Sequence, residues 1–272
     1  ADLKSFDFSA KQKTYVSITN KKMNLNLENK NALVCGSTQG IGKSTAIALA
    51  SEGVKVTLVA RNESKLKEVL KQLPNTENHN YIVADFMDPE ALKSKVESYI
   101  LEKHGFHILV NNTGGPRSGS IIDAKLEAFE DAFTQHLKCN HVLAQITVPF
   151  MKKVSFGRII NIISTSVKEP IEGLGVSNTI RNAVGNWSKT LSFELGSFGI
   201  TVNNVLPGFT NTNRLKSLIT KKSEIQGKTE DEIAKAMKSQ VPAGRFGEAN
   251  EVANAVAFLC TPAAAYINGI NF

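Results

Sequence analysis

Short apolar runs alternate with longer amphipathic segments along most of this chain, and the alternation predicts its fold. Strands are expected at residues 32–35, 54–60, 81–84, 108–111, 158–163, 201–206 and 266–272. Helices are expected at residues 41–49, 63–73, 89–103, 126–153 (one long helix or a pair), 176–197, 214–240 and 251–259. The expected strands are almost continuously apolar, which is typical of strands covered by helices on both faces. We therefore predict one α/β domain, a doubly wound parallel sheet of about seven strands with helices on both faces.

The composition agrees with one large domain. Of the 272 residues, 42% are hydrophobic, which is enough for one sizeable core. The chain has no apolar run of the roughly 18 residues that a membrane span needs. Residues 1–22 are lysine-rich, lack the apolar stretch of a secretory signal and lie outside the strand and helix pattern. We expect the domain to cover 23–272, with Met23 as a natural start, and residues 1–22 to be an extension that is mobile or foreign to the natural protein.

The cysteines and the charge narrow the class of protein. Cys35, Cys139 and Cys260 are few, odd in number and far apart, which favours a reduced cytoplasmic protein over a disulfide framework. The formal net charge is +7, but the basic residues form no dense block interleaved with aromatics. We therefore expect no nucleic-acid or membrane partner. The charge indicates a solvated surface or a modest attraction to acidic or phosphate-bearing ligands.

A glycine-rich turn follows the first expected strand and opens the first expected helix. Its sequence is Gly36-Ser37-Thr38-Gln39-Gly40-Ile41-Gly42. Glycines let the backbone approach a ligand closely, and the free N–H groups of a helix N-terminus attract a pyrophosphate. The turn therefore predicts a dinucleotide site. The P-loop of NTPases needs four residues between its glycines, whereas Gly36 and Gly42 enclose five. A purely structural turn remains the alternative.

The residue after the second expected strand indicates which dinucleotide binds. A carboxylate at this point would bind the adenosine 2′-hydroxyl of NAD. The chain has Arg61 instead, and a guanidinium suits the 2′-phosphate of NADP through charge-assisted hydrogen bonds. We therefore expect NADP(H) as the cofactor, with Arg61 as an ordinary surface side chain as the alternative.

The order of several motifs resembles the short-chain dehydrogenase/reductase family. The glycine turn is followed by Asp85-Phe86, Asn111-Asn112-Thr113-Gly114, Asn161-Ile162-Ile163-Ser164, Pro207-Gly208-Phe209-Thr210-Asn211-Thr212 and Gly244-Arg245-Phe246-Gly247. Within the family, the run from 27 to 272 resembles 3-oxoacyl-acyl-carrier-protein reductases and their divergent relatives. The resemblance implies a Rossmann sheet, NADP(H) along the strand ends, and a tetramer or dimer in contact through strand 266–272.

The resemblance also implies where the cofactor lies. Asp85 would face the adenine amine, and Thr212 would approach the nicotinamide carboxamide. The turn after the fourth strand would support the cofactor. The further cofactor-binding residues that the resemblance implies are Phe86, Asn112, Thr113, Gly114, Pro207 and Arg181.

The catalytic pattern of the family is altered in this chain. Family members carry a serine after the fifth strand, a tyrosine 13 residues later and a lysine four residues after that. Ser164 matches the serine, but the other two positions hold Ser177 and Arg181. A helix asparagine of the family falls on the stretch that begins at His136. The resemblance thus makes Ser164, Ser177, Arg181 and His136 the candidate catalytic residues.

These replacements affect the proton transfer that ketone reduction requires. A serine hydroxyl is a far weaker acid than a tyrosine, and an arginine stays protonated. His136 could supply a proton if it points into the site, but a packing role is equally open. Tyr99 and Lys103 have the family's four-residue spacing, yet they precede Ser164, so we do not expect them to be the catalytic pair. The histidines show no metal-ligand spacing, and we expect no metal.

Two functions follow from this pattern. The first is an NADP(H)-dependent oxidoreductase that reduces a 3-oxoacyl-like carbonyl to an alcohol, with Ser164 and Ser177 polarising the carbonyl and His136 or an ordered water donating the proton. Its substrate would be selected by 214–240 and 115–122, and the lysines of 214–240 leave an acyl carrier protein open as a partner. The second is a catalytically weak or inactive NADP(H)-binding protein that acts as a sensor or subunit partner.

Overall fold

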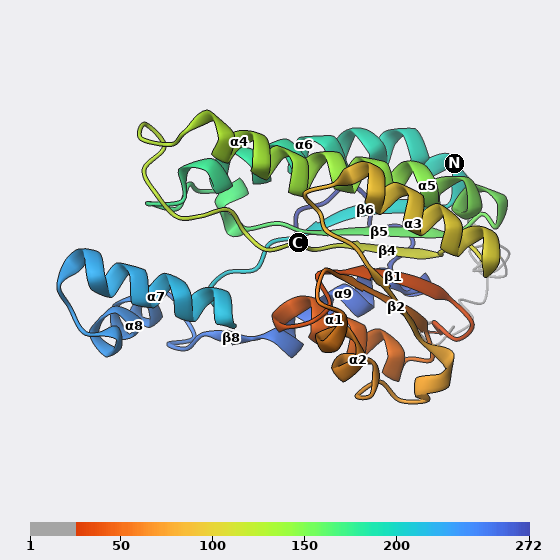
Figure 1. Cartoon of the computed structure of the whole chain (residues 1–272), viewed down its shortest axis with the longest axis horizontal. Coiled ribbons are helices and arrows are strands. Elements are labelled where there is room, and N and C mark those ends of the chain that lie inside the picture. The colour runs from red at the N-terminus through yellow and green to blue at the C-terminus, as the bar shows by residue number, and fades with distance from the viewer. Residues whose placement is uncertain (1–25) are drawn as a thin grey trace, which may run out of the picture.

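Six parallel strands form the centre of the computed structural model, which describes residues 26–272 (Figure 1). The strands are β1 (Asn31–Cys35), β2 (Lys55–Ala60), β3 (Asn80–Val83), β4 (Ile108–Asn111), β5 (Gly157–Ile162) and β6 (Ile200–Val205). Their order is β3-β2-β1-β4-β5-β6, so the chain reverses its direction of progress across the sheet between β1 and β4. This order confirms the predicted doubly wound, Rossmann-type sheet. The predicted extension at 1–22 and the proposed start at Met23 lie outside the described residues.

Helices cover both faces of the sheet, as predicted (Figure 1). One layer contains α1 (Gly40–Ser51), α2 (Glu63–Leu70) and α9 (Ala249–Cys260). The other layer contains α3 (Pro89–Glu102), α5 (Cys139–Lys153) and α6 (Gly175–Leu195). Successive residues of β1 pack alternately into the two layers: Val34 belongs to the first apolar core and Leu33 to the second. Because both faces are buried, the strands are apolar without interruption.

One helical rod spans the region predicted as a long helix or a pair. It consists of α4 (Leu126–Phe133), a π-helical turn (Thr134–Lys138) and α5. A π turn widens the helix by one residue and is common at functional sites. Here the turn carries His136, which is buried. Short 3₁₀ helices lie at Thr76–Asn78, Thr165–Val167, Gly196–Phe198 and Pro262–Ala264.

The prediction of a seventh sheet strand at 266–272 is wrong. This segment runs beside β6, where the Asn204 N–H donates to the Ile270 carbonyl at 2.9 Å, but it forms only one isolated bridge. Asparagine side chains take up other main-chain groups at this edge. The Val202 N–H donates to the Asn268 side-chain oxygen at 2.8 Å, and the Asn203 amide donates to the Ile267 carbonyl at 2.7 Å. Three further main-chain hydrogen bonds join the segment to β6, from the Gly269 N–H to Val202, from the Leu206 N–H to Phe272 and from the Phe272 N–H to Asn204. The segment therefore lies along the edge of the sheet, and the side-chain hydrogen bonds only interrupt its ladder.

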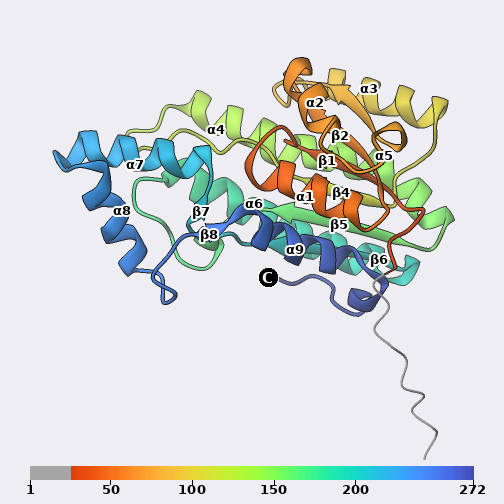
Figure 2. The same cartoon turned by 90° about the horizontal axis from the view of Figure 1, so that it is seen from below.

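The predicted helical stretch 214–240 consists of two helices that project from one end of the sheet (Figure 2). They are α7 (Asn213–Gln226) and α8 (Glu230–Ser239). The break occurs at Gly227, whose φ of 62° is left-handed, a conformation that glycine adopts without steric cost. The pair packs around its own apolar cluster, which includes Leu215 and Ile233. Two short strands, β7 (Thr210–Asn211) and β8 (Gly247–Glu248), connect the pair to the rest of the domain.

Candidate functional site

The carboxyl ends of the parallel strands bring the predicted site residues to one edge of the sheet. Gly36, Arg61 and Asn112 directly follow β1, β2 and β4. Asp85, Ser164 and Pro207 come two residues after β3, β5 and β6. In an open α/β sheet, ligands bind in the crevice at this edge, where the strand order reverses. The fold therefore supports one shared site rather than scattered residues.

The glycine turn packs directly against the loop that follows β4. The φ of Gly36 is 57°, and a β-carbon on this residue would lie 2.5 Å from the Asn112 carbonyl oxygen. A β-carbon on Gly42 would collide with the Gly36 carbonyl oxygen. The Asn112 amide donates to the carbonyls of Cys35 and Gly36, at 3.3 and 3.2 Å. The amide thus holds the turn in place, and only glycine fits at these two positions.

The N-terminus of α1 beside this turn fits a pyrophosphate. The helix has no side-chain cap and no acidic residue in its first turn. Its first N–H groups and its positive dipole end therefore suit a bound anion. Ser37 is fully buried, and its hydroxyl accepts a hydrogen bond from the Val59 N–H at 3.0 Å. This bond ties the turn to β2, whereas Thr38 is partly exposed and makes no side-chain hydrogen bond with the described residues.

The end of β2 presents a positive charge with no acidic partner. Arg61 is exposed and forms no ion pair with the residues that the structure describes. The nearest acidic residue along the chain, Glu63, forms an ion pair with Lys67 at 2.8 Å and accepts a hydrogen bond from the Tyr81 hydroxyl at 2.9 Å. The hydrogen bonds from these two side chains lower the pKa of Glu63. This arrangement suits a phosphate at the end of β2 better than a ribose hydroxyl.

His136 lies next to the loop after β4. Its Nδ1 atom is 2.7 Å from the Thr113 hydroxyl, while its buried Nε2 atom has no hydrogen-bond partner among the described residues. Burial, and after it the nearby charge of Arg181, lowers the pKa of His136 well below its ordinary value. The imidazole is therefore neutral at neutral pH, which does not support the expectation that it donates a proton as an imidazolium. It retains one ring nitrogen for hydrogen bonding.

Ser177 and Arg181 lie one turn apart on α6, beside the end of β5. Both are largely buried, with 7% and 8% of their surface exposed. Arg181 donates to the Ile162 carbonyl at 2.7 Å, and its Nε–H is buried without a partner. Burial, and after it the charge of Arg214, lowers the pKa of Arg181 to about 10, so the guanidinium remains charged at neutral pH. The Ser177 hydroxyl makes no hydrogen bond with the described residues.

The remaining predicted residues surround this pair. Ser164 caps a 3₁₀ turn, where its oxygen accepts from the Ser166 N–H at 3.1 Å, so its hydroxyl hydrogen is free to donate. Thr212 caps α7 and lies against the glycine turn, with its Cγ2 atom 3.2 Å from the position of a β-carbon on Gly40. Asp85 is exposed and accepts from the Met87 N–H at 3.0 Å. Pro207 and Phe86 are half-buried at the same edge.

Sequence reasoning did not single out Arg214, which the structure brings to this edge. Its guanidinium donates to the Pro116 carbonyl at 2.6 Å, just beyond the loop that contacts His136. The sequence feature that could have identified Arg214 is its position two residues after Thr212, in the first turn of α7. Sequence reasoning placed Asn111 in the turn that would support the cofactor, but it did not foresee that Asn111 donates to Asn161 at 2.8 Å and joins the ends of β4 and β5.

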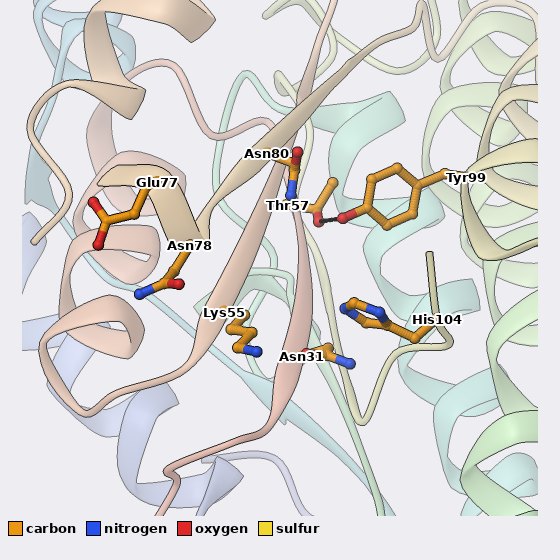
Figure 3. Close-up of a pocket in the computed structure, with 8 residues that line it drawn as sticks. All are labelled: Asn31, Lys55, Thr57, Glu77, Asn78, Asn80, Tyr99 and His104. Carbon is orange, nitrogen blue, oxygen red and sulfur yellow. Dashed lines mark hydrogen bonds between the residues drawn. The ribbon is translucent and has the colours of Figure 1, made fainter. Parts of the chain in front are cut away.

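Figure 3 shows a pocket lined by Asn31, Lys55 and Asn80, which begin β1, β2 and β3, so it lies at the edge of the sheet opposite the candidate site. It has a volume of about 160 Å³ and is lined by the first residues of β1, β2 and β3, so it is smaller than the roughly 300–1,000 Å³ of most ligand sites. Tyr99 lies here, and its hydroxyl is 3.0 Å from that of Thr57. The Tyr99–Lys103 pair is thus remote from the candidate site. No cluster of three or more metal-binding side chains occurs within residues 26–272.

No helix in the described part of the chain is both long enough and apolar enough to cross a membrane.

The three cysteines are buried free thiols. Burial raises the pKa of Cys139 and of Cys260 to about 12 in each case.

Comparisons with known proteins agree with this arrangement. A family model described as enoyl-(acyl carrier protein) reductase matches residues 36–272. The 3-oxoacyl-(acyl-carrier-protein) reductase FabG of Vibrio cholerae is 36% identical over 247 residues, which covers 90% of this chain and 95% of the relative. FabG of Escherichia coli is 35% identical with the same coverage.

A solved structure shows the same fold. The L-sorbose reductase of Gluconobacter frateurii, in complex with NADPH and L-sorbose, superposes with a TM-score of 0.85 at 28% identity, covering 92% of this chain and 96% of that one. The motif order, the sheet topology and these matches confirm the expected family. The chain belongs to the short-chain dehydrogenase/reductase family of oxidoreductases and is related to the 3-oxoacyl-acyl-carrier-protein reductases.

Proposed function

We propose that the protein is an NADP(H)-dependent reductase that converts a carbonyl substrate of the 3-oxoacyl kind to an alcohol. One observation carries the proposal: the glycine turn, the unpaired Arg61 and a buried polar group around Arg181 lie along the same edge of the sheet. The names of the relatives support it, since FabG proteins are 3-oxoacyl-acyl-carrier-protein reductases and the sorbose reductase binds NADPH.

Different residues of the chain would bind different parts of the cofactor. The turn Gly36–Gly42 would hold the pyrophosphate, and Arg61 the 2′-phosphate. Asp85 and Phe86 would lie at the adenine. The nicotinamide half would contact Asn112, Thr113, Gly114, Pro207, Thr212 and Arg181. When bound, the reduced nicotinamide supplies a hydride to the carbonyl carbon.

The catalytic residues act on the carbonyl oxygen. Ser164 and Ser177 donate hydrogen bonds to this oxygen, and the fixed charge of Arg181 stabilises the negative charge that develops on it. The oxygen then takes one proton to form the alcohol. Because the pKa of His136 is well below its ordinary value, we assign this proton to an ordered water, with the free Nε2 atom of His136 as a hydrogen-bonding partner of that water.

A second function is favoured by the same residues. None of the four candidate catalytic side chains (Ser164, Ser177, Arg181 and neutral His136) can release a proton near neutral pH. A catalytically weak or inactive protein that binds NADP(H) as a sensor or subunit partner would not need a proton donor. We also propose that the protein forms a homo-oligomer, dimer or tetramer, and that an acyl carrier protein delivers its substrate if the substrate is a thioester.

Turnover distinguishes the two functions. NADPH oxidation is measured with a panel of 3-oxoacyl thioesters, free oxo acids and keto sugars. We expect at least one substrate to be reduced, with a loss of about 10²-fold or more in kcat for Ser164→Ala, the usual cost of one oxyanion donor. Thr165→Ala, an exposed neighbour, is the control. Binding of NADPH without reduction of any substrate would favour the sensor or subunit partner.

A further inference from the structure

Two arginines from different helices approach the reaction end of the site. Arg181, on α6, donates to the Ile162 carbonyl at the end of β5. Arg214, on α7, donates to the Pro116 carbonyl in the loop after β4, and its Nε and one terminal nitrogen would lie 3.4 Å from a β-carbon on Gly115. Ile162 ends β5 and Pro116 lies in the loop after β4, which is the neighbour of β5 in the sheet, so both guanidinium groups are held at the carboxyl edge of this strand pair. The Arg214 charge accordingly lowers the pKa of Arg181 and of His136.

Arg181 is buried and Arg214 is exposed, and neither forms an ion pair with an acidic side chain of the described residues. Among residues 26–272, ion pairs join only Lys67 to Glu63 and Arg245 to Glu251. Burying a guanidinium without a counter-ion is costly, and a second positive charge nearby increases the cost. A ligand that brings a negative charge would remove part of this penalty.

Two buried nitrogen atoms without hydrogen-bond partners point to the same conclusion. The Nε–H of Arg181 and the Nε2 atom of His136 are buried and lack hydrogen-bond partners among the described residues. Their residues are 8% and 3% exposed, so surface water does not readily solvate them. Buried polar groups in folded proteins are usually paired, and the missing partner of the Arg181 Nε–H is an acceptor. A carboxylate matches the planar fork of an arginine and carries four acceptor positions.

We infer that the substrate is an oxo acid whose free carboxylate binds between Arg181 and Arg214, while Ser164 and Ser177 hold its keto oxygen. The inference rests on the proposed function and narrows its substrate class, because a thioester carries no charge at this position. The phosphates of the cofactor are assigned to the glycine turn and Arg61, at the other half of the site. The carboxylate itself is not altered in the reaction.

Matched acids and esters test this inference by binding alone. The protein is saturated with NADP⁺, which prevents reduction, and titrated by calorimetry with pyruvate, acetoacetate and levulinate and with the methyl ester of each. We expect at least one acid to bind about tenfold or more tightly than its ester, as charged hydrogen bonds suggest. Arg214→Ala should abolish this preference and Arg214→Lys should retain part of it. Lys235→Ala, which removes the same charge from exposed α8, should leave it unchanged.

Three results would overturn the inference. They are equal affinity for every acid and its ester, an acid preference that survives in Arg214→Ala, and binding of inorganic phosphate in place of any carboxylate. Binding of NADPH is measured separately by fluorescence. If NADPH binds and neutral ketones are reduced, any of these three results would contradict only the assignment of an oxo acid as substrate. Failure to bind NADPH would contradict the proposed function itself.

Discussion

The cofactor half and the catalytic half of the candidate site differ in how their polar groups are paired. In the cofactor half, the Asn112 amide and the Ser37 hydroxyl are bonded to the backbone of the glycine turn and of β2. In the catalytic half, buried nitrogen atoms of His136 and Arg181 have no partner among the described residues. The first half is thus formed by the protein alone, whereas the second half needs a ligand to satisfy it.

This contrast has a consequence for stability. A pre-formed turn resists change because its neighbours are backbone atoms that cannot move away. An unpaired buried charge costs the folded protein free energy, which a ligand recovers. Substitutions in the cofactor half should therefore lower the stability of the fold, whereas substitutions in the catalytic half should lower activity with little loss of stability.

The largest effect is expected at Arg181. Arg181→Met should lower kcat by about 10²–10³-fold, the usual cost of losing an oxyanion-stabilising donor. Its melting temperature should stay equal or rise, because a buried charge without a counter-ion is removed. Steady-state kinetics and calorimetry measure the two effects. Lys189→Met, an exposed change on the same helix, should leave kcat intact. A loss of stability with unchanged kcat would reverse the assignment of the two halves.

The glycine turn should behave in the opposite way. Gly42→Ala places a methyl group against the Gly36 carbonyl, so the turn must shift at a cost of about 1–3 kcal/mol in the free energy of unfolding. NADPH affinity, followed by nicotinamide fluorescence, should fall with it. At Gly119, a β-carbon would meet nothing within 4 Å, and Gly119→Ala is the matched control. Unchanged stability and affinity in Gly42→Ala would show that the turn is not rigidly held.

Arg61 tests the cofactor half without disturbing the fold. Arg61→Ala should weaken NADPH binding by about tenfold or more, since a charged hydrogen bond is worth about 1.5–3 kcal/mol. NADH lacks the 2′-phosphate, so its affinity should not change. Lys65→Ala, an exposed residue on α2, provides the control. If Arg61→Ala weakened both cofactors equally, the phosphate assignment would be wrong.

The smallest effect concerns pH and His136. The pKa of His136 is lowered in the folded protein, so the unfolded chain binds the extra proton first as the pH falls. The stability from its neutral form is full above the unfolded pKa of about 6.5 and is lost progressively below it, by at most about 1.4 kcal/mol per pH unit.

Comparison with His136→Asn isolates this effect, because the pKa of His107 is also lowered, to about 4. Urea unfolding at pH 7 and pH 5 should show a smaller loss of stability in the variant. An equal loss in both proteins would mean that His136 does not titrate as proposed.

Local sequence signals were sufficient for most of the fold. Apolar runs and the glycine turn are short-range features, so the six sheet strands, the doubly wound parallel class of sheet and the β1–α1 junction could be predicted. The edge segment 266–272 is hydrogen-bonded to β6 along its backbone, but the Asn203 and Asn268 side chains take two of the main-chain partners. No regular strand forms there, and hydrophobicity does not reveal this. The break at Gly227 was overlooked because both flanking segments are helical.

The candidate site was predictable only where its residues follow strands. Residues at strand ends can be assigned by counting, because parallel strands end at one edge. The approach of Arg214 to the site of Arg181 depends on how α7 lies over the loop after β4, and no local sequence pattern predicts this packing. The neutral state of His136 depends in the same way on burial by distant segments.

The central claim, that this edge of the sheet binds NADP(H), is tested most directly by calorimetric titration of the wild-type protein with NADPH and NADH. We predict that NADPH binds about tenfold or more tightly than NADH, because only NADPH carries the phosphate that Arg61 would bind. Absence of heat with both cofactors, or equal affinity for the two, would contradict the account.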